Sequence, residues 1–191
     1  MIKKRFLFIV LIAVVFNFIN AEAGKNREYS VGDRGPAGGY VFYVNPAFEQ
    51  DGWTYLEAAP ADQSSGIEWG DNYKINNPAD VGSGFGNTDT IIAIQGDGLL
   101  NGKGPYAAKI CKDYIFDAYD DWFLPSKMEL KLMYTALKSK GIGNFSDSFY
   151  WSSTGSEAAA MANARNFADG GTDDQYGFKN FKNSVRAVRR F

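Results

Sequence analysis

Apolar and β-branched residues concentrate in two short runs early in the chain. The run YVFYV (40–44) follows a pair of glycines, and the run WTYLEAAP (53–60) comes after a turn that contains Pro46, Asp51 and Gly52. Short β-rich runs that are separated by turn residues are typical of paired strands. We therefore predict that these two runs form a strand pair.

Residues 121–141, DWFLPSKMELKLMYTALKSKG, carry the clearest helical pattern. Ser126 and Glu129 form an S-x-x-E capping box, and apolar residues then recur at helical spacing. These apolar residues are Leu130, Met133, Tyr134 and Leu137. Two lysines near the end suit the negative end of a helix dipole, and Gly141 can end the helix. The pattern predicts a helix that starts at Ser126.

Two further segments have weaker helix signals. The segment NTDTIIAIQ begins with side chains that can cap a helix, which predicts a short helix over 88–95. The segment PYAAKICKDYIF (105–116) begins with Pro105, a favoured first helical residue. Its apolar residues can line one buried side: Ala107, Ala108, Ile110, Cys111 and Tyr114. We expect Cys111 to be a core residue, because a reactive thiol needs an exposed site that favours the thiolate.

The second half of the chain contains three strand-like runs, FYWSST (149–154), MANARNF (161–167) and SVRAVRRF (184–191). The first two are separated by a turn of small residues and are predicted neighbours. Two helices among strands that gather at both chain ends predict an α+β domain with paired terminal strands. Two segments rich in Gly, Asn and Asp, 61–104 and 168–183, form long polar loops in this arrangement.

The first residues predict export. A basic start at Lys3, Lys4 and Arg5 precedes an apolar run (6–19), and Ala21-Glu22-Ala23 has small residues at the spacing that signal peptidase needs. An uncleaved anchor is the alternative, but a membrane span needs about 20 apolar residues. The apolar run is shorter than that. We therefore expect a signal peptide over 1–23.

Cleavage after Ala23 leaves a short lead (24–34) and one domain (35–191). No cysteine lies near the cleavage point, so acylation to a lipoprotein is not expected. The mature protein is expected to be secreted, periplasmic or on the cell surface, with no stable membrane span.

Composition excludes several kinds of chemistry. The chain has no histidine, the usual general base near neutral pH. Its single cysteine leaves no internal disulfide. Loss of residues 1–23 would leave 17 Lys and Arg against 21 Asp and Glu, so net charge gives no general attraction to nucleic acid. Together with the lack of a recognisable catalytic motif, this favours a protein that is not an enzyme.

Five motifs occur in one order over residues 35–191: GGYVFYV, WTYLEAAP, DWFLPSKMEL, YWSST and VRAVRRF. Together they resemble the Lcl C-terminal domain family, named after a bacterial collagen-like adhesin. The resemblance implies a C-type-lectin-like fold with paired terminal strands, two main flanking helices, a small antiparallel sheet and long polar loops that bind ligands. In that family the last strand would lie beside the first one, 40–44.

The sequence departs from relatives of that fold in three ways. It lacks the Glu-Pro-Asn, Gln-Pro-Asp and Trp-Asn-Asp triplets that bind calcium and sugar in C-type lectins. It also lacks the paired cysteines of the formylglycine-generating members, and no collagen-like repeat precedes the domain. Neither calcium-dependent sugar chelation nor that oxidase chemistry is implied.

Binding residues are expected in the two polar loops, where aromatic faces and hydrogen-bonding groups occur together, as a saccharide requires. They are Trp69, Asp71, Asn72 and Tyr73 in the first loop, and Asp169, Asp173, Asp174, Tyr176, Lys179 and Lys182 in the second. The alternative is that both loops are only solvated surface. The carboxylates of the second loop do not fit an EF-hand, so no cofactor is expected and calcium stays open on a weak signal.

Large apolar residues near both helix and strand motifs are expected to form the core. They are Trp122, Phe123, Leu124, Tyr150 and Trp151. Five basic residues gather at the C-terminus: Lys179, Lys182, Arg186, Arg189 and Arg190. We expect Arg186 to pair with a body carboxylate, with Asp121 and Glu57 as candidates, and Asp120 or Asp121 to pair with Arg186 or Arg189. The two lysines are expected to be free for an anionic partner.

These observations favour an exported binding module, similar to an adhesin, that recognises a glycan, a sulfated polyanion or a protein. Two other classes stay open. An exported glycan hydrolase would need two convergent carboxylates in a concave pocket. A structural envelope protein would be favoured by a large exposed apolar patch.

Overall fold

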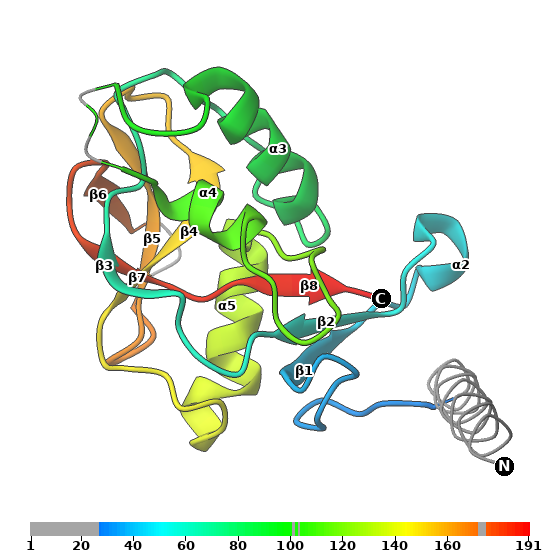
Figure 1. The fold of residues 1–191 in the computed structure, drawn as a ribbon. Coiled ribbons are helices and arrows are strands. Elements are labelled where there is room, and N and C mark those ends of the chain that lie inside the picture. Colours follow the sequence, from blue (N-terminus) through cyan, green and yellow to red (C-terminus); the bar gives the residue numbers. More distant parts are fainter. Residues whose placement is uncertain (1–26, 101, 103, 172–174) are drawn as a thin grey trace, which may run out of the picture.

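The structure, a computed structural model, describes residues 27–100, 102, 104–171 and 175–191. These residues form an α+β domain with two sheets and two main helices (Figure 1). The signal segment 1–23 lies outside the described residues, so its cleavage and the export of the chain stay predictions. Within the described part of the chain, no helix combines the length and the apolar character that crossing a membrane requires.

The small sheet has three antiparallel strands in the order β1 (Tyr40–Val44), β2 (Tyr55–Ala58) and β8 (Val188–Arg190). The predicted pairing of the first two strands is confirmed, and a short helix α2 (Phe48–Asp51) lies between them in sequence. The expectation that the last strand lies beside the first was wrong, since β8 pairs with β2.

Hydrogen bonds at the outer edge of β1 explain why β8 does not lie beside it. The amide of Gly32 donates to the carbonyl of Val41 at 2.8 Å, and the amide of Val41 donates to the carbonyl of Asp33 at 2.9 Å. The lead therefore occupies the edge where β8 was expected. The lead also packs on the strands beyond β1, since the buried Tyr29 ring lies 5.4 Å from the rings of Tyr55 and Phe191.

The second sheet is curled and has five strands in the order β3-β7-β4-β5-β6. They are β3 (Ser64–Ile67), β7 (Asn183–Val185), β4 (Phe149–Gly155), β5 (Met161–Asn166) and β6 (Tyr176–Phe178). The predicted pairing of β4 with β5 is confirmed, and only β7 and β4 run parallel among the described strand pairs. Strand β6 lies at one edge of this sheet.

The last run was predicted as one strand but divides into β7 and β8, which belong to different sheets. The strand is interrupted at Arg186 and Ala187. There the backbone of Ala187 forms hydrogen bonds with the loop that follows β2. The amide of Ala59 donates to the carbonyl of Ala187 at 2.9 Å, and the amide of Ala187 donates to the side chain of Gln63. Val185 and Ala187 face the first core cluster, whereas Val188 faces the second.

Helix α5 (Lys127–Ala136) confirms the clearest prediction. The amide of Glu129 donates to Oγ of Ser126 at 3.2 Å, and the amide of Ser126 donates to the Glu129 carboxylate at 2.7 Å. A 3₁₀ turn, η1 (Lys138–Lys140), follows and ends at Gly141, whose φ of 72° is left-handed. These contacts are the capping box and the glycine stop that the sequence indicates.

The other two helices begin elsewhere than predicted. Helix α3 (Gly84–Gln95) starts four residues before Thr88, because the turn that leads into it is held by the distant carboxylate of Glu129, which accepts from the amide of Gly82 at 2.7 Å. Helix α4 (Ala107–Lys112) starts after Pro105, because Tyr106 stays extended. The hydroxyl of Tyr106 donates to the carbonyl of Gly96 at 2.6 Å and ties α4 to the end of α3.

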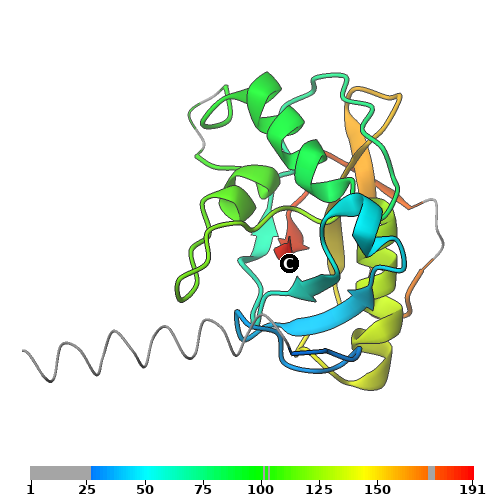
Figure 2. The same ribbon diagram turned by 90° about the vertical axis from the view of Figure 1, so that its right-hand side faces the viewer.

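Two clusters of buried side chains form the core. The first lies between the curled sheet, α3 and α4, and contains Trp122, Leu124 and Trp151 together with Cys111. The second lies between α5 and both sheets, and contains Phe123 and Tyr150. Figure 2 shows α3 and α4 side by side, with α5 apart from them. The predicted core residues, including Cys111, are therefore confirmed.

The buried Glu129 should make stability depend on pH. Burial raises the pKa of its carboxyl from 4.5 to about 7, although nearby amide donors oppose the rise. Between these values the folded state binds a proton more tightly than the unfolded state. The free energy of unfolding is therefore expected to fall by roughly 2–3 kcal/mol as pH rises from about 5 to about 7.5.

Urea denaturation across that range tests this expectation. No imidazole titrates there, because the chain has no histidine. Burial also raises the pKa of Glu57, which adds a slope of the same sign. The control is therefore Glu129→Gln, which should lose most of the slope. Equal pH profiles for the two proteins would contradict the assignment.

A candidate ligand-binding surface on the polar loops

The structure brings the two polar loops together through buried contacts. The amide of Trp69 in the first loop donates to the carbonyl of Lys179 in the second at 2.8 Å. The ammonium of Lys179 lies 4.4 Å from the centre of the Trp69 ring and donates to the carbonyl of Tyr73 at 2.5 Å. The two loops thus support each other, although they are far apart in sequence.

Trp69 and Lys179 do not lie on the surface, and this corrects the sequence expectation. Both side chains have an exposed fraction of 0%. Trp69 also donates from Nε1 to the carbonyl of Ser152 at 2.7 Å, so it is anchored in the core. Burial lowers the pKa of Lys179 to about 8, while the indole face and a carbonyl satisfy its ammonium group. The expectation that Lys179 is free for an anion was wrong.

The other predicted residues of the first loop have different roles. Asp71 holds the loop, since its carboxylate accepts from the amide of Leu100 at 3.0 Å. Tyr73 is half-buried against the first core cluster, and Asn72 is exposed. Of these three residues, Asn72 and the edge of Tyr73 can therefore reach a ligand.

In the second loop, the exposed Asp169 caps a turn by accepting from the amide of Gly171 at 2.9 Å. Asp173 and Asp174 lie outside the described residues. Where the structure describes the chain, no three His, Cys, Asp or Glu side chains are placed to hold a metal ion.

Three aromatic rings lie exposed on the edge strand β6 and on the turn that follows it. Tyr176 and Phe178 are 45% and 50% exposed, and Phe181 is 52% exposed. Alternate residues of a strand point to one face, so Tyr176 and Phe178 share a face. The rings of Phe178 and Phe181 lie 5.5 Å apart in an edge-to-face contact. We call these three side chains the aromatic surface.

Gly177 explains why the rings point outward. It lies between Tyr176 and Phe178 and faces the core, where an added Cβ would come within 2.8 Å of the Trp151 ring. A larger residue at this position would displace the strand. The alternation Tyr-Gly-Phe therefore places one small residue inside and two aromatic residues outside.

Lys182, which follows Phe181 in sequence, is paired within the domain. The ammonium of Lys182 is exposed but lies 3.4 Å from the carboxylate of Glu68, which is almost buried. An ion pair of this kind leaves little net field for a charged ligand. The exposed rings of the aromatic surface therefore suit a ligand with apolar faces.

The C-terminal arginines also have partners within the domain. Arg186 pairs with Asp62 at 2.6 Å, so neither Asp121 nor Glu57 is its partner as predicted. Arg189 takes both of those carboxylates, at 2.7 Å and 2.9 Å. The register of β8 causes this, since it places Arg189 opposite Glu57. The guanidinium of Arg190 lies 4.2 Å from the centre of the Phe85 ring.

Phe178 and Phe181 were missed as site residues in the sequence. The signal that could have found them is the pattern YGFKNF (176–181), where a glycine separates two aromatic residues at strand spacing. That pattern is short and directly follows a segment rich in Gly and Asp, so it does not stand out as a strand.

Comparison with models of known protein families finds no match to this chain, and a search of curated proteins finds none either. The resemblance to the Lcl C-terminal domain family rests on sequence motifs alone and stays a prediction. The geometry of the surface must therefore carry any assignment of function.

Proposed function

We propose that this domain is an exported, non-catalytic binding module that recognises a neutral glycan through the aromatic surface. One observation carries the proposal: three half-exposed rings lie together on β6 and the turn after it, next to Lys182, which is already paired with Glu68. Contiguous exposed apolar groups on a soluble domain mark interaction sites. The CH faces of sugar rings pack on aromatic rings, whereas their hydroxyls need polar neighbours such as Asn180 and Lys182. The motif resemblance to an adhesin domain and the predicted signal peptide agree with this role.

A sulfated polyanion is supported less well. Binding to a polyanion needs several cations that can approach it together. Of the five basic residues near the C-terminus, Lys179 is buried and the other four contact a carboxylate or a ring. The lysines on which that alternative depended do not form an open basic patch.

Glu129, the carboxyl group with the most strongly raised pKa, does not support a glycan hydrolase either. Glu129 has the raised pKa of a general acid, but its side chain has an exposed fraction of 0%. A catalytic acid must touch the bond that it protonates. Glu129 instead joins the starts of α3 and α5 and serves the fold.

Phe178→Ala and Phe181→Ala are each expected to weaken glycan binding by roughly 5- to 30-fold, because each removes about 1–2 kcal/mol of stacking and burial. The measurement starts with an array of neutral, acidic and sulfated glycans, with calcium and with a chelator. Calorimetric titration with the strongest ligand then compares the variants. Phe48→Ala is the matched control, since Phe48 is 47% exposed but lies on α2.

Two results would contradict the proposal. One is the absence of binding to any glycan on the array. The other is a dimer of the native chain in light scattering that Phe178→Ala converts to a monomer. That result would assign the aromatic surface to self-association and would favour the structural envelope role.

A further inference from the structure

A depression of about 440 Å³ lies between the loop after β2 and the end of α4, and it shares no residue with the aromatic surface. Its apolar side is formed by Pro105, Ile110 and Ile115, and its polar side includes Asp62, Gln63 and Tyr114. Sites for small molecules have volumes of about 300–1,000 Å³ and combine apolar walls with a few fixed polar groups. The depression has both properties.

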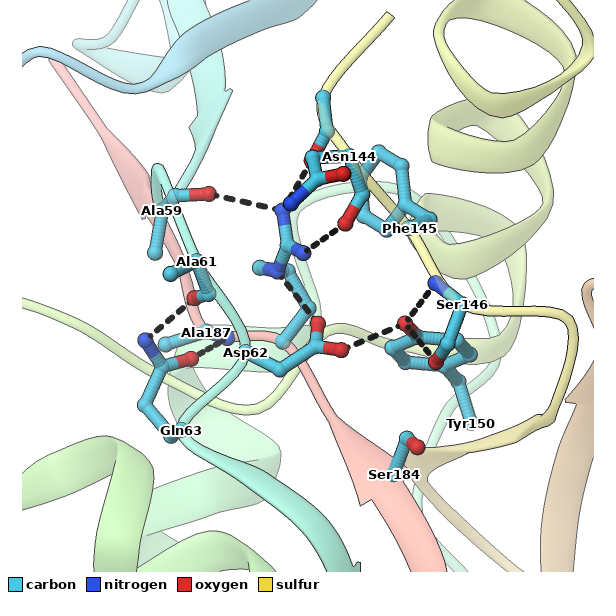
Figure 3. Close-up of polar contacts among 12 residues, drawn as sticks. Ala59, Ala61, Asp62, Gln63, Asn144, Phe145, Ser146, Tyr150, Ser184 and Ala187 are labelled. Carbon is cyan, nitrogen blue, oxygen red and sulfur yellow. Dashed lines mark hydrogen bonds and ion pairs between the residues drawn. The ribbon is translucent and has the colours of Figure 1, made fainter. Parts of the chain in front are cut away.

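Hydrogen bonds to neighbouring residues hold the polar side chains of the lining in place. Figure 3 shows the carboxylate of Asp62 accepting from the hydroxyl of Tyr150, at 2.7 Å. The other oxygen of Asp62 accepts from Nε of the buried Arg186 at 2.6 Å. Arg186 is itself fixed, since its guanidinium donates to the carbonyls of Ala59 at 3.0 Å and Gly143 at 2.8 Å. This network holds the side chain of Asp62, which lines the depression, in one position.

Gln63 and Tyr114 are fixed in the same way. The amide group of Gln63 donates to the carbonyl of Ala61 at 2.8 Å and accepts from the amide of Ala187 (Figure 3). Tyr114 packs edge-to-face on the buried Trp122, with ring centres 5.4 Å apart. Burial raises the pKa of the Tyr114 phenol, although a hydrogen bond with Gln63 opposes the rise. Binding here would cost little ordering of side chains.

The charges of the lining are balanced. Asp62 pairs with Arg186, and Asp113 pairs with Lys109 at 2.6 Å. A free anion or cation would therefore gain little from either carboxylate. Carboxylate oxygens that already accept from a cation still have lone pairs for a hydroxyl group. A ligand with several hydroxyls and one apolar face matches this lining.

We infer that the depression is a second binding site, which takes a single neutral sugar residue. The ring lies with its CH face on Ile110 and Ile115, and its hydroxyls donate to Asp62 and Asp113. The phenol of Tyr114 bonds to a further ring substituent. This site is independent of the proposed role of the aromatic surface.

The test titrates the mature chain, labelled for NMR, with glucose, mannose, galactose and N-acetylglucosamine in turn. At least one sugar is expected to shift the backbone and side-chain amide signals of Gln63. Tyr114→Phe should weaken that binding by roughly 3- to 10-fold through the loss of one hydrogen bond. Ile115→Ala should weaken it at least about 3-fold, and it should fold normally because Ile115 is 69% exposed.

Two control variants separate the sites. Ile94→Ala removes an exposed isoleucine on α3 that does not line the depression, and it should leave the affinity unchanged. Phe178→Ala should also leave this titration unchanged, whatever its effect on glycan binding elsewhere. A loss of affinity in Phe178→Ala equal to that in Tyr114→Phe would overturn the independence of the site.

Three other results would overturn the inference. The first is that none of the four sugars shifts the Gln63 signals. The second is binding that Tyr114→Phe and Ile115→Ala leave unchanged. The third is a response to the diamine putrescine alone, which would show that the carboxylates select a cation.

Discussion

Replacement of Arg186 by alanine is expected to lower the free energy of unfolding by about 3–5 kcal/mol, because it removes a buried guanidinium and leaves the largely buried carboxylate of Asp62 without its counter-charge. Arg186 is 1% exposed, and its guanidinium carbon lies 4.1 Å from the centre of the Phe145 ring. The variant would remove the ion pair to Asp62 and would orphan the carbonyls of Ala59 and Gly143. Urea denaturation monitored by tryptophan fluorescence measures the change.

The matched control is Arg190→Ala. Arg190 is half-buried and contacts the face of Phe85, so its loss should cost about 1 kcal/mol or less. Arg186→Lys should fall between the two, because an ammonium group cannot reproduce the forked geometry of a guanidinium. A thermally silent Arg186→Ala would mean that the break between β7 and β8 does not depend on this network.

Replacement of Trp69 by alanine should destabilise the domain by about 3–5 kcal/mol, as is typical for a buried tryptophan. The ammonium of Lys179 packs on the ring of Trp69, and the indole of Trp69 donates a hydrogen bond to Ser152 in β4. The variant would leave the ammonium of Lys179 beside a cavity. The melting temperature and the urea midpoint should both fall.

Trp69→Phe separates packing from hydrogen bonding. It keeps an aromatic ring under Lys179 but leaves the carbonyl of Ser152 without the indole donor, which should cost about 1–3 kcal/mol. A surface residue would behave differently, since exposed substitutions change stability by about 0.5 kcal/mol or less. A change that small in Trp69→Ala would restore Trp69 as a candidate for direct ligand contact.

The features that the sequence predicted correctly depend on neighbours along the chain. Ser126 and Glu129 are three residues apart, so their capping box follows from local chemistry. The pairing of β4 with β5 likewise follows from two β-rich runs joined by a short turn. The burial of Trp122 and Trp151 follows from side-chain size and apolar character.

The features that the sequence predicted wrongly depend on contacts between segments that are far apart in the chain. The start of α3 is set by Glu129, 47 residues from Gly82. Lys179 is buried because Tyr73, 106 residues away, supplies a carbonyl and Trp69 supplies a ring. A lysine in a polar loop has no local signal for such a partner. Of the predicted site residues, Trp69 and Lys179 are excluded from the surface for this reason, whereas Asp173 and Asp174 lie outside the described residues.

The position of β8 also has a consequence for how the chain folds. The last strand completes a sheet whose other strands lie near the start of the chain, and its hydrogen bond from Arg189 to Glu57 joins residues 132 positions apart. Closing so long a loop costs entropy before any contact is gained, and such topologies fold slowly. During synthesis β1 and β2 can pair early, but the three-stranded sheet is not complete until β8 has left the ribosome.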